Sequence, residues 1–220
     1  MTVEDGGAPS ERTRVRRMHE RSRYERAAVY AILDAGLLCH VGYVVDGQPY
    51  VTPTAHWREG DHLYWHGSSA SRMLRTQRSG VPVCVTVSLL DGLVMARSGF
   101  HHSMNYRSVM ALGTAEFIEA PEAKLAALEA FTDRVAPGRW QEVRPPTDQE
   151  LKATTIMRLA LDEASAKVRT GPPVDDEADY ALPCWAGVVP VATRAGPCQP
   201  DPRLAPGTPA PDYLRTLRVG

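Results

Sequence analysis

Short stretches of apolar or alternating residues, separated by tight turns, constrain the fold of this chain more than any other feature. Residues 37–45 are typical of a β-strand, and Asp46-Gly47 behind them is a strong signal for a hairpin turn. The strand pattern resumes over 50–57 and again over 62–66, with a turn-forming Arg-Glu-Gly-Asp between them. These segments predict an antiparallel meander of three strands.

The same pattern continues after a short helix that we expect over 69–78. Valines at every second position give residues 81–89 one apolar face, and Asp91-Gly92 indicates a turn. Further strands are expected over 93–97, 106–119, 154–161 and 185–191. Longer helices are expected over 24–35 and 121–135. Many short strands with few helices predict a mainly β fold, a closed antiparallel barrel with flanking helices.

Length and composition narrow the class of protein. A chain of 220 residues with 43% apolar residues suits one domain with a sizeable core. A formal net charge of −1 favours neither nucleic acid nor a membrane as a partner. The N-terminus lacks the apolar stretch of a secretory signal. The four cysteines are scattered without a Cys-x-x-Cys pair, so we expect reduced thiols, no metal site and a cytoplasmic location.

Three parts of the chain are expected. Residues 1–16 are polar and predict a flexible N-terminal segment, residues 17–195 hold the barrel domain, and residues 196–220 carry six prolines and predict a flexible tail. Arginine is dense between Arg12 and Arg26. That run suits a solvated helix or an arm that reaches a partner subunit. Nucleic-acid binding is disfavoured because no aromatic platform accompanies it.

A cluster of hydroxyls and one cation follows the strand that ends at Gly67. Ser68, Ser69, Ser71 and Arg72 stand at the expected start of a helix, where free N–H groups and a partial positive charge attract anions. Convergent donors of this kind suit a terminal phosphate. The plainer alternative is a serine that caps a surface helix. The cluster does not match the glycine-rich phosphate loops of nucleotide-binding folds.

Five segments in order also carry a family resemblance. They are residues 47–53, 66–72, 105–109, 167–171 and 185–190. Together they span most of the chain, and with them it resembles the pyridoxamine 5'-phosphate oxidase-like superfamily of flavin-binding split barrels. The closest likeness is to its flavin-nucleotide-binding or nitroimidazole-resistance-like branch. The resemblance implies a split barrel with FMN as cofactor.

The resemblance implies roles for the hydroxyl cluster and for a later strand. In the family, the segment that matches Gly67 to Arg72 binds the FMN phosphate; Met73 stands where narrower relatives carry a lysine, so Arg72 supplies the charge here. It also places Tyr106, Arg107 and Ser108 near the flavin phosphate or ring. From the residues alone, an arginine that enters a strand is more often an edge charge or an ion-pair partner.

Three further residues are candidates for the flavin ring. Thr54 and His56 follow Pro53, where the family's backbone faces the ring, although a proline in a strand also marks an edge or a bulge. His66 precedes the hydroxyl cluster and matches a histidine linked to activity in nitroimidazole-resistance-like members. A histidine there can move protons. The alternative for His66 is a structural histidine bonded to a backbone carbonyl.

Other conspicuous residues receive structural interpretations. His101-His102, with Asn105 nearby, lacks a third ligand at a recognisable spacing and predicts a surface turn. The acidic residues between 175 and 179 predict a solvated loop. Trp185 is expected in the core rather than as a lid over the flavin.

These expectations favour an FMN-dependent oxidoreductase that acts on a small molecule, with nitroaromatic reduction as the subclass the resemblance suggests. A non-catalytic module that stores or senses FMN is an alternative, as is a split barrel that holds haem or a deazaflavin. A small barrel is filled by its own side chains. The flavin is therefore expected outside it, between the two subunits of a homodimer, as in split-barrel relatives.

Overall fold

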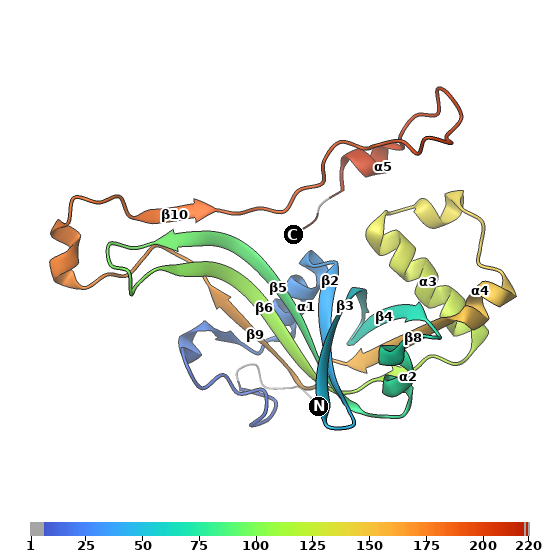
Figure 1. Ribbon diagram of the computed structural model, residues 1–220, viewed down its shortest axis with the longest axis horizontal. Helices are drawn as coiled ribbons and strands as arrows, with labels where there is room; N and C mark the ends of the chain where they lie inside the picture. The colour runs from blue at the N-terminus through green and yellow to red at the C-terminus, as the bar shows by residue number, and fades with distance from the viewer. Residues whose placement is uncertain (1–6, 218, 220) are drawn as a thin grey trace.

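The computed structural model describes residues 7–217 and 219, and antiparallel strands make up most of its regular secondary structure (Figure 1). In sheet order these are β1 (Ser22–Arg23), β9 (Ala164–Arg169), β6 (Ser103–Thr114), β5 (Pro82–Met95), β2 (Leu38–Val45), β3 (Gln48–Glu59), β4 (His62–Ser68), β8 (Thr154–Ala160) and β7 (Glu116–Phe117), with β10 (Gly187–Pro190) paired to β5. β5 and β6 form a long hairpin that extends beyond the barrel, with β10 along its edge (Figure 1).

The sheet curls around one apolar core. The expected meander is present as β2, β3 and β4, and alternate residues of the strands point inward. Buried side chains from β2, β4, β5, β6 and β8 form this core, among them Val41, Leu63, Trp65, Val85, Val109 and Leu159. β6 meets β8 at Gly113, where a methyl group would lie 2.8 Å from Leu159 Cδ1. A curled antiparallel sheet with few helices matches the mainly β barrel that the sequence pattern predicts, in the split form that the family resemblance implies.

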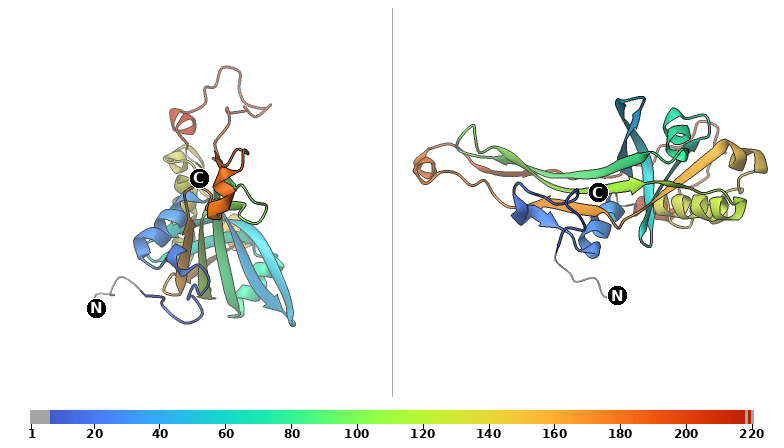
Figure 2. Two further views of the ribbon diagram at one scale, coloured as in Figure 1. Left: turned by 90° about the vertical axis from the view of Figure 1, so that its left-hand side faces the viewer. Right: turned by 90° about the horizontal axis from the view of Figure 1, so that it is seen from below.

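Helices close the barrel and cover one outer face. α1 (Arg26–Ala35) buries one apolar side against the core, and α2 (Arg72–Arg78) buries Met73, Leu74 and Gln77, the last bonded to Trp65. α3 (Pro121–Val135) packs outside β3 and β8, over Trp57 and Ile156. The shorter helices are η1 (His19–Arg21), η2 (Arg139–Glu142), α4 (Asp148–Ala153), η3 (Glu177–Ala181) and α5 (Asp212–Arg215). Figure 2 shows α3 and the long hairpin at opposite ends of an elongated molecule.

Two expectations about strands are wrong. Asp91-Gly92 is not a turn: β5 runs through it, with a register shift against β6 between Leu90 and Gly92. A bulge tolerates the same residue types as a turn, which explains the error. The long strand expected over 106–119 begins earlier and ends at Thr114. β9 was not expected as a strand, because small residues such as Ala164 and Ala166 carry a weak strand signal.

The described ends of the chain touch the domain. Thr13 is buried, and the Val15 N–H donates to the Tyr24 hydroxyl at 2.9 Å. Near the other end, the Tyr213 hydroxyl donates to Glu142 of η2. Part of the expected flexible first segment, residues 1–6, lies outside the described residues, as do positions 218 and 220. Within the described part, no helix combines the length and apolar character that a membrane crossing requires.

Candidate functional site

The hydroxyl cluster lies where β4 ends and α2 begins. The Ser69 N–H donates to Ala153 O at 2.8 Å and the Ser71 N–H to Ser68 O at 2.9 Å, which fixes the loop. The first N–H groups of a helix have no partner within it. No described side chain caps those of α2. The structure therefore brings Gly67, Ser68, Ser69 and Ser71 to an uncapped helix start, and the simple serine cap of the alternative interpretation is not formed.

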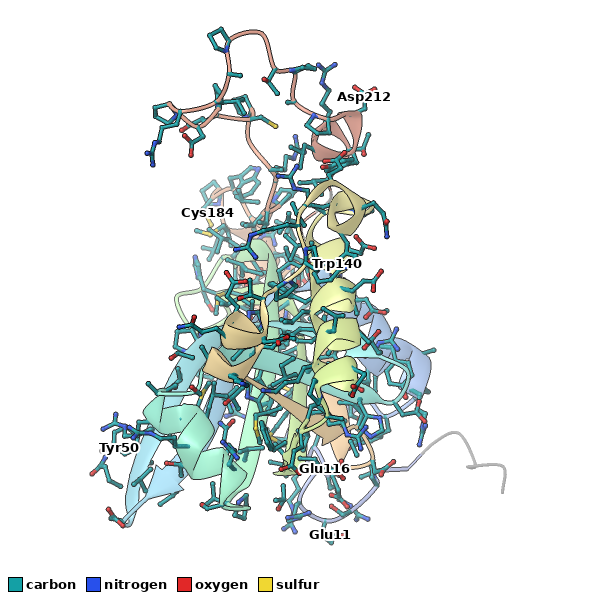
Figure 3. All side chains as sticks on the ribbon, turned by 90° about the vertical axis from the view of Figure 1, so that its right-hand side faces the viewer. Glu11, Tyr50, Glu116, Trp140, Cys184 and Asp212 are labelled. Carbon is teal, nitrogen blue, oxygen red and sulfur yellow. The ribbon has the colours of Figure 1, made fainter. Side chains whose placement is uncertain are left out.

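Arg72 supplies an exposed cation at this start. Its guanidinium carbon lies 4.1 Å from the centroid of the Tyr50 ring, and Tyr50 stacks on Tyr43 at 5.7 Å. Figure 3 shows Tyr50 on the edge of the molecule beside α2. No ion pair found among the described residues includes Arg72. A cation held over an aromatic ring, without a carboxylate, keeps its hydrogen-bond donors available for an anion.

Thr54 and His56 lie on β3 with different exposures. The Thr54 hydroxyl is half-buried and 3.5 Å from His66 O, a long contact. The His56 ring is in the core, where Nε2 lies 3.0 Å from Leu33 O. A carbonyl only accepts hydrogen bonds, so Nε2 is the donor, and burial lowers the pKa of the ring. His56 joins β3 to α1; to touch a ligand outside the barrel, its ring would have to leave the core.

His66 lies on the outer face of β4, beneath α3. Its ring is 4.6 Å from the centroid of Phe131 and 5.8 Å from that of Trp57. Burial lowers its pKa, so the ring is neutral at pH 7. Its Nδ1 is buried with no hydrogen-bond partner among the described residues. A neutral imidazole with one unsatisfied nitrogen, directly before Gly67, can donate or accept one proton.

The β6 candidates lie apart from the hydroxyl cluster. The Arg107 guanidinium bonds both carboxylate oxygens of Asp91, at 2.7 and 2.9 Å, which raises its pKa. The Ser108 hydroxyl donates to Lys167 O at 3.3 Å, and the neighbouring Tyr106 is half-buried. β3, β2, β5 and β6 are successive in the sheet, so Thr54 and Ser108 are separated by three strand spacings, roughly 14 Å along the sheet. One chain does not gather all the candidates around one point.

A basic cavity lies elsewhere, between the N-terminal segment, β9 and the loop before β6. It has a volume of about 560 Å³. Its lining residues are Arg17, Met18, Arg21, Phe100, His101, His102, Ser103, Lys167, Arg169 and Val174. Sequence reasoning missed it, because it treated the arginine run and the histidine pair separately. The arginines and the histidines were each visible in the sequence. Their shared cavity depends on the pairing of β1 with β9, which brings the N-terminal segment to this side of the sheet.

Trp185 is a further correction. It precedes β10 and is 67% exposed, whereas the sequence predicts it in the core. Its ring lies against Gly187, where a methyl group would be 2.9 Å from the indole. The acidic loop also differs from the expectation of solvated charge at one position: Asp175 is buried and accepts from the Arg97 N–H at 3.0 Å.

The chain is similar to several solved structures. The flavocytochrome Anf3 from Azotobacter vinelandii is 50% identical over 98% of this chain and 100% of that one, with a TM-score of 0.93. A FAD- and haem-binding protein from Mycobacterium smegmatis is 41% identical over 90% of this chain and 98% of that one, with a TM-score of 0.87. A protein from Bacteroides thetaiotaomicron, named for 5-nitroimidazole antibiotic resistance, is 26% identical over 67% of this chain and 86% of that one, with a TM-score of 0.55.

The comparison with curated proteins found no significant match. A family model described as pyridoxamine 5'-phosphate oxidase matches residues 25–168, from the start of α1 to near the end of β9. This span contains the meander, the hydroxyl cluster and the β6 candidates. The chain therefore belongs to the pyridoxamine 5'-phosphate oxidase family.

Proposed function

We propose that this chain is a redox protein of the flavocytochrome kind that binds FAD and haem. The observation that carries the proposal is the 50% identity to a flavocytochrome over nearly the full length of both chains. The protein from Mycobacterium smegmatis, at 41% identity, binds FAD and haem. Because that relative binds FAD, we propose FAD as the flavin of this chain, in place of the FMN that the sequence led us to expect. The haem alternative raised by the sequence gains support in the same way.

The residues at the start of α2 fit a flavin phosphate. They offer an uncapped helix start, the hydroxyls of Ser69 and Ser71 and the Arg72 guanidinium, all of them donors. Thr54 and His66 lie next to this group and are the candidates for the ring. When bound, a flavin supplies two-electron chemistry with access to single-electron steps, and the protein supplies position and electrostatics. His66 would hold a proton at Nδ1 near that ring.

The surface supports a homodimer with the flavin at its interface. Met104 of β6, Leu93 of β5 and Val189 of β10 lie directly opposite one another, and all three are exposed. An apolar row of this kind favours a partner surface. A second chain would also bring its own Arg107 and Ser108 toward a flavin that one chain holds only at α2.

Light scattering of the purified protein is expected to give twice the mass of one chain. Leu93→Glu is expected to give a monomer with reduced flavin affinity. A flavin-loaded wild-type monomer would exclude the interface site.

Reduction of small nitroaromatic molecules is a second candidate activity. It is favoured by the neutral His66 beside the hydroxyl cluster and by the 26% identical resistance protein. His66→Ala is expected to keep the flavin and slow the reduction of a nitroaromatic test substrate by NADH. If turnover is unchanged, His66 is structural. If the wild-type protein turns over no nitroaromatic substrate, this second candidate activity is wrong, and a module that stores or senses the flavin is favoured.

The cofactor itself is tested by release from the purified, denatured protein. Chromatography is expected to identify FAD, and the absorption spectrum of the intact protein is expected to combine flavin bands with a haem Soret band. FMN or a deazaflavin as the released chromophore would contradict the FAD assignment. A spectrum without a flavin would contradict the proposed function altogether.

A further inference from the structure

The basic cavity has the size and the charge of a site for an anionic cofactor. Its volume of about 560 Å³ lies within the range of sites for small molecules and cofactors. Four of its described lining residues are basic, and none is acidic: the basic residues are Arg17, Arg21, Lys167 and Arg169. The N-terminal segment and β9 that form it lie on the side of the barrel away from α2 (Figures 1 and 2).

Arg169 is the most unusual of these cations. It is 8% exposed and bonds only neutral acceptors, the side chain of Asn105 and the carbonyls of Gly171 and Pro172. Burial lowers its pKa, and the charge of Arg21 lowers it further. A buried cation beside other cations, without a carboxylate, is costly unless an anion joins it. The cavity is thus built for a ligand that carries negative charge.

His102 gives the cavity a metal-binding nitrogen. Its Nδ1 lies 2.9 Å from Ser98 O, and because a carbonyl only accepts, Nδ1 carries the proton. This tautomer leaves Nε2 as the nitrogen whose lone pair can bind a metal. Histidines that bind metals are held in this way, with the other ring N–H on a backbone carbonyl. His101 differs, because its Nε2 lies 3.7 Å from the Asp176 carboxylate.

We propose that this cavity is the haem site, where His102 Nε2 would bind the iron and Arg21, Lys167 and Arg169 would pair with the two propionates. The inference rests on the proposed function for the presence of haem, and it goes beyond it by assigning the residues. A histidine ligand holds many b-type haems. Arginine pairs with carboxylates through two parallel bonds, which suits the propionates. Phe100, 90% exposed at the cavity wall, supplies an apolar face for the macrocycle.

The iron ligand is tested by titrating the haem-free protein with hemin. The wild type, His102→Ala and two controls are compared: His101→Ala lies in the cavity, and His40→Ala removes an exposed histidine of β2. In His102→Ala the iron–histidine vibration of the ferrous protein is expected to disappear and hemin to bind at least about tenfold more weakly. Added imidazole is expected to restore the wild-type spectrum. His40→Ala is expected to match the wild type, and His101→Ala is expected to keep the iron–histidine vibration.

The propionate partners are tested by removing charge from either side. Lys167→Gln and Arg21→Gln are each expected to weaken hemin binding about tenfold while keeping the iron–histidine vibration. Neither change is expected to alter the affinity for haem with both propionates esterified. Arg23→Gln, on β1 outside the lining, is the matched control.

The outcomes separate this assignment from the proposed function. If His102→Ala keeps the wild-type iron spectrum, or if His101→Ala or His66→Ala loses it instead, the assignment is wrong although the protein binds haem. If the wild type binds FAD but not hemin, the assignment and the haem part of the proposed function both fail. If it binds neither, the proposed function fails as a whole.

Discussion

Replacement of Arg72 by alanine tests the role of the α2 start in flavin binding. The only described contact of its guanidinium is with the Tyr50 ring, at 4.1 Å. A cation–π contact at an exposed site contributes about 0.5–1 kcal/mol, so the free energy of unfolding falls by no more than about 1 kcal/mol. A bond between a charged donor and a phosphate contributes about 1.5–3 kcal/mol. The dissociation constant of the flavin is therefore expected to rise about tenfold to a hundredfold.

The assay is a fluorescence titration of flavin-free protein with FAD, together with urea unfolding of the same samples. Arg75→Ala is the matched control, because Arg75 is also exposed but lies in the last turn of α2. It is expected to leave FAD affinity unchanged. Equal affinities for Arg72→Ala, Arg75→Ala and the wild type would refute the reasoning and move the phosphate away from α2. Arg107→Ala would then be the next variant to titrate.

Two predictions concern buried polar groups. Gln77→Leu removes the acceptor that lies 2.9 Å from Trp65 Nε1 in the core. The free energy of unfolding, measured in urea, is therefore expected to fall by about 1–3 kcal/mol. Gln48→Leu, at an exposed position, is the control and is expected to leave it unchanged. Burial lowers the folded-state pKa of His56 and His66 below the unfolded value of 6.5, so the unfolded chain takes up protons first as the pH falls. Stability is therefore expected to decrease from pH 6.5 downward, and His56→Gln to reduce that slope; an unchanged slope would mean that His56 is not buried as a neutral ring.

Much of the barrel could be predicted because its strands alternate clearly. The valines of β5 mark the inward face, and Asp46-Gly47 fixes the first hairpin. Asp91-Gly92 could not be read correctly, since the same residues form turns and bulges, and the choice depends on pairing with β6. The sequence places Trp185 in the core because large aromatic residues usually lie there. In the structure it is exposed, since it precedes β10, which pairs with β5 at the edge of the long hairpin.

The site was predictable where its residues are neighbours in sequence. Gly67 to Arg72 form one local motif, and the structure keeps them together at α2. The ring of His56 could not be assigned to the core from sequence, because that depends on α1 presenting Leu33 O. The basic cavity could not be foreseen either: its cations come from the N-terminal segment and β9, and its histidines from the loop before β6.

An anaerobic reductive titration of the purified protein tests the central claim most directly. Reductant is added in known amounts while the flavin and haem bands are followed by absorption. A chain with one flavin and one haem is expected to consume about three electrons, two at the flavin and one at the iron. Consumption of about two electrons, with bleaching of the flavin band alone, would contradict the haem part of the account. Consumption of about one electron at a haem band alone would contradict the flavin part.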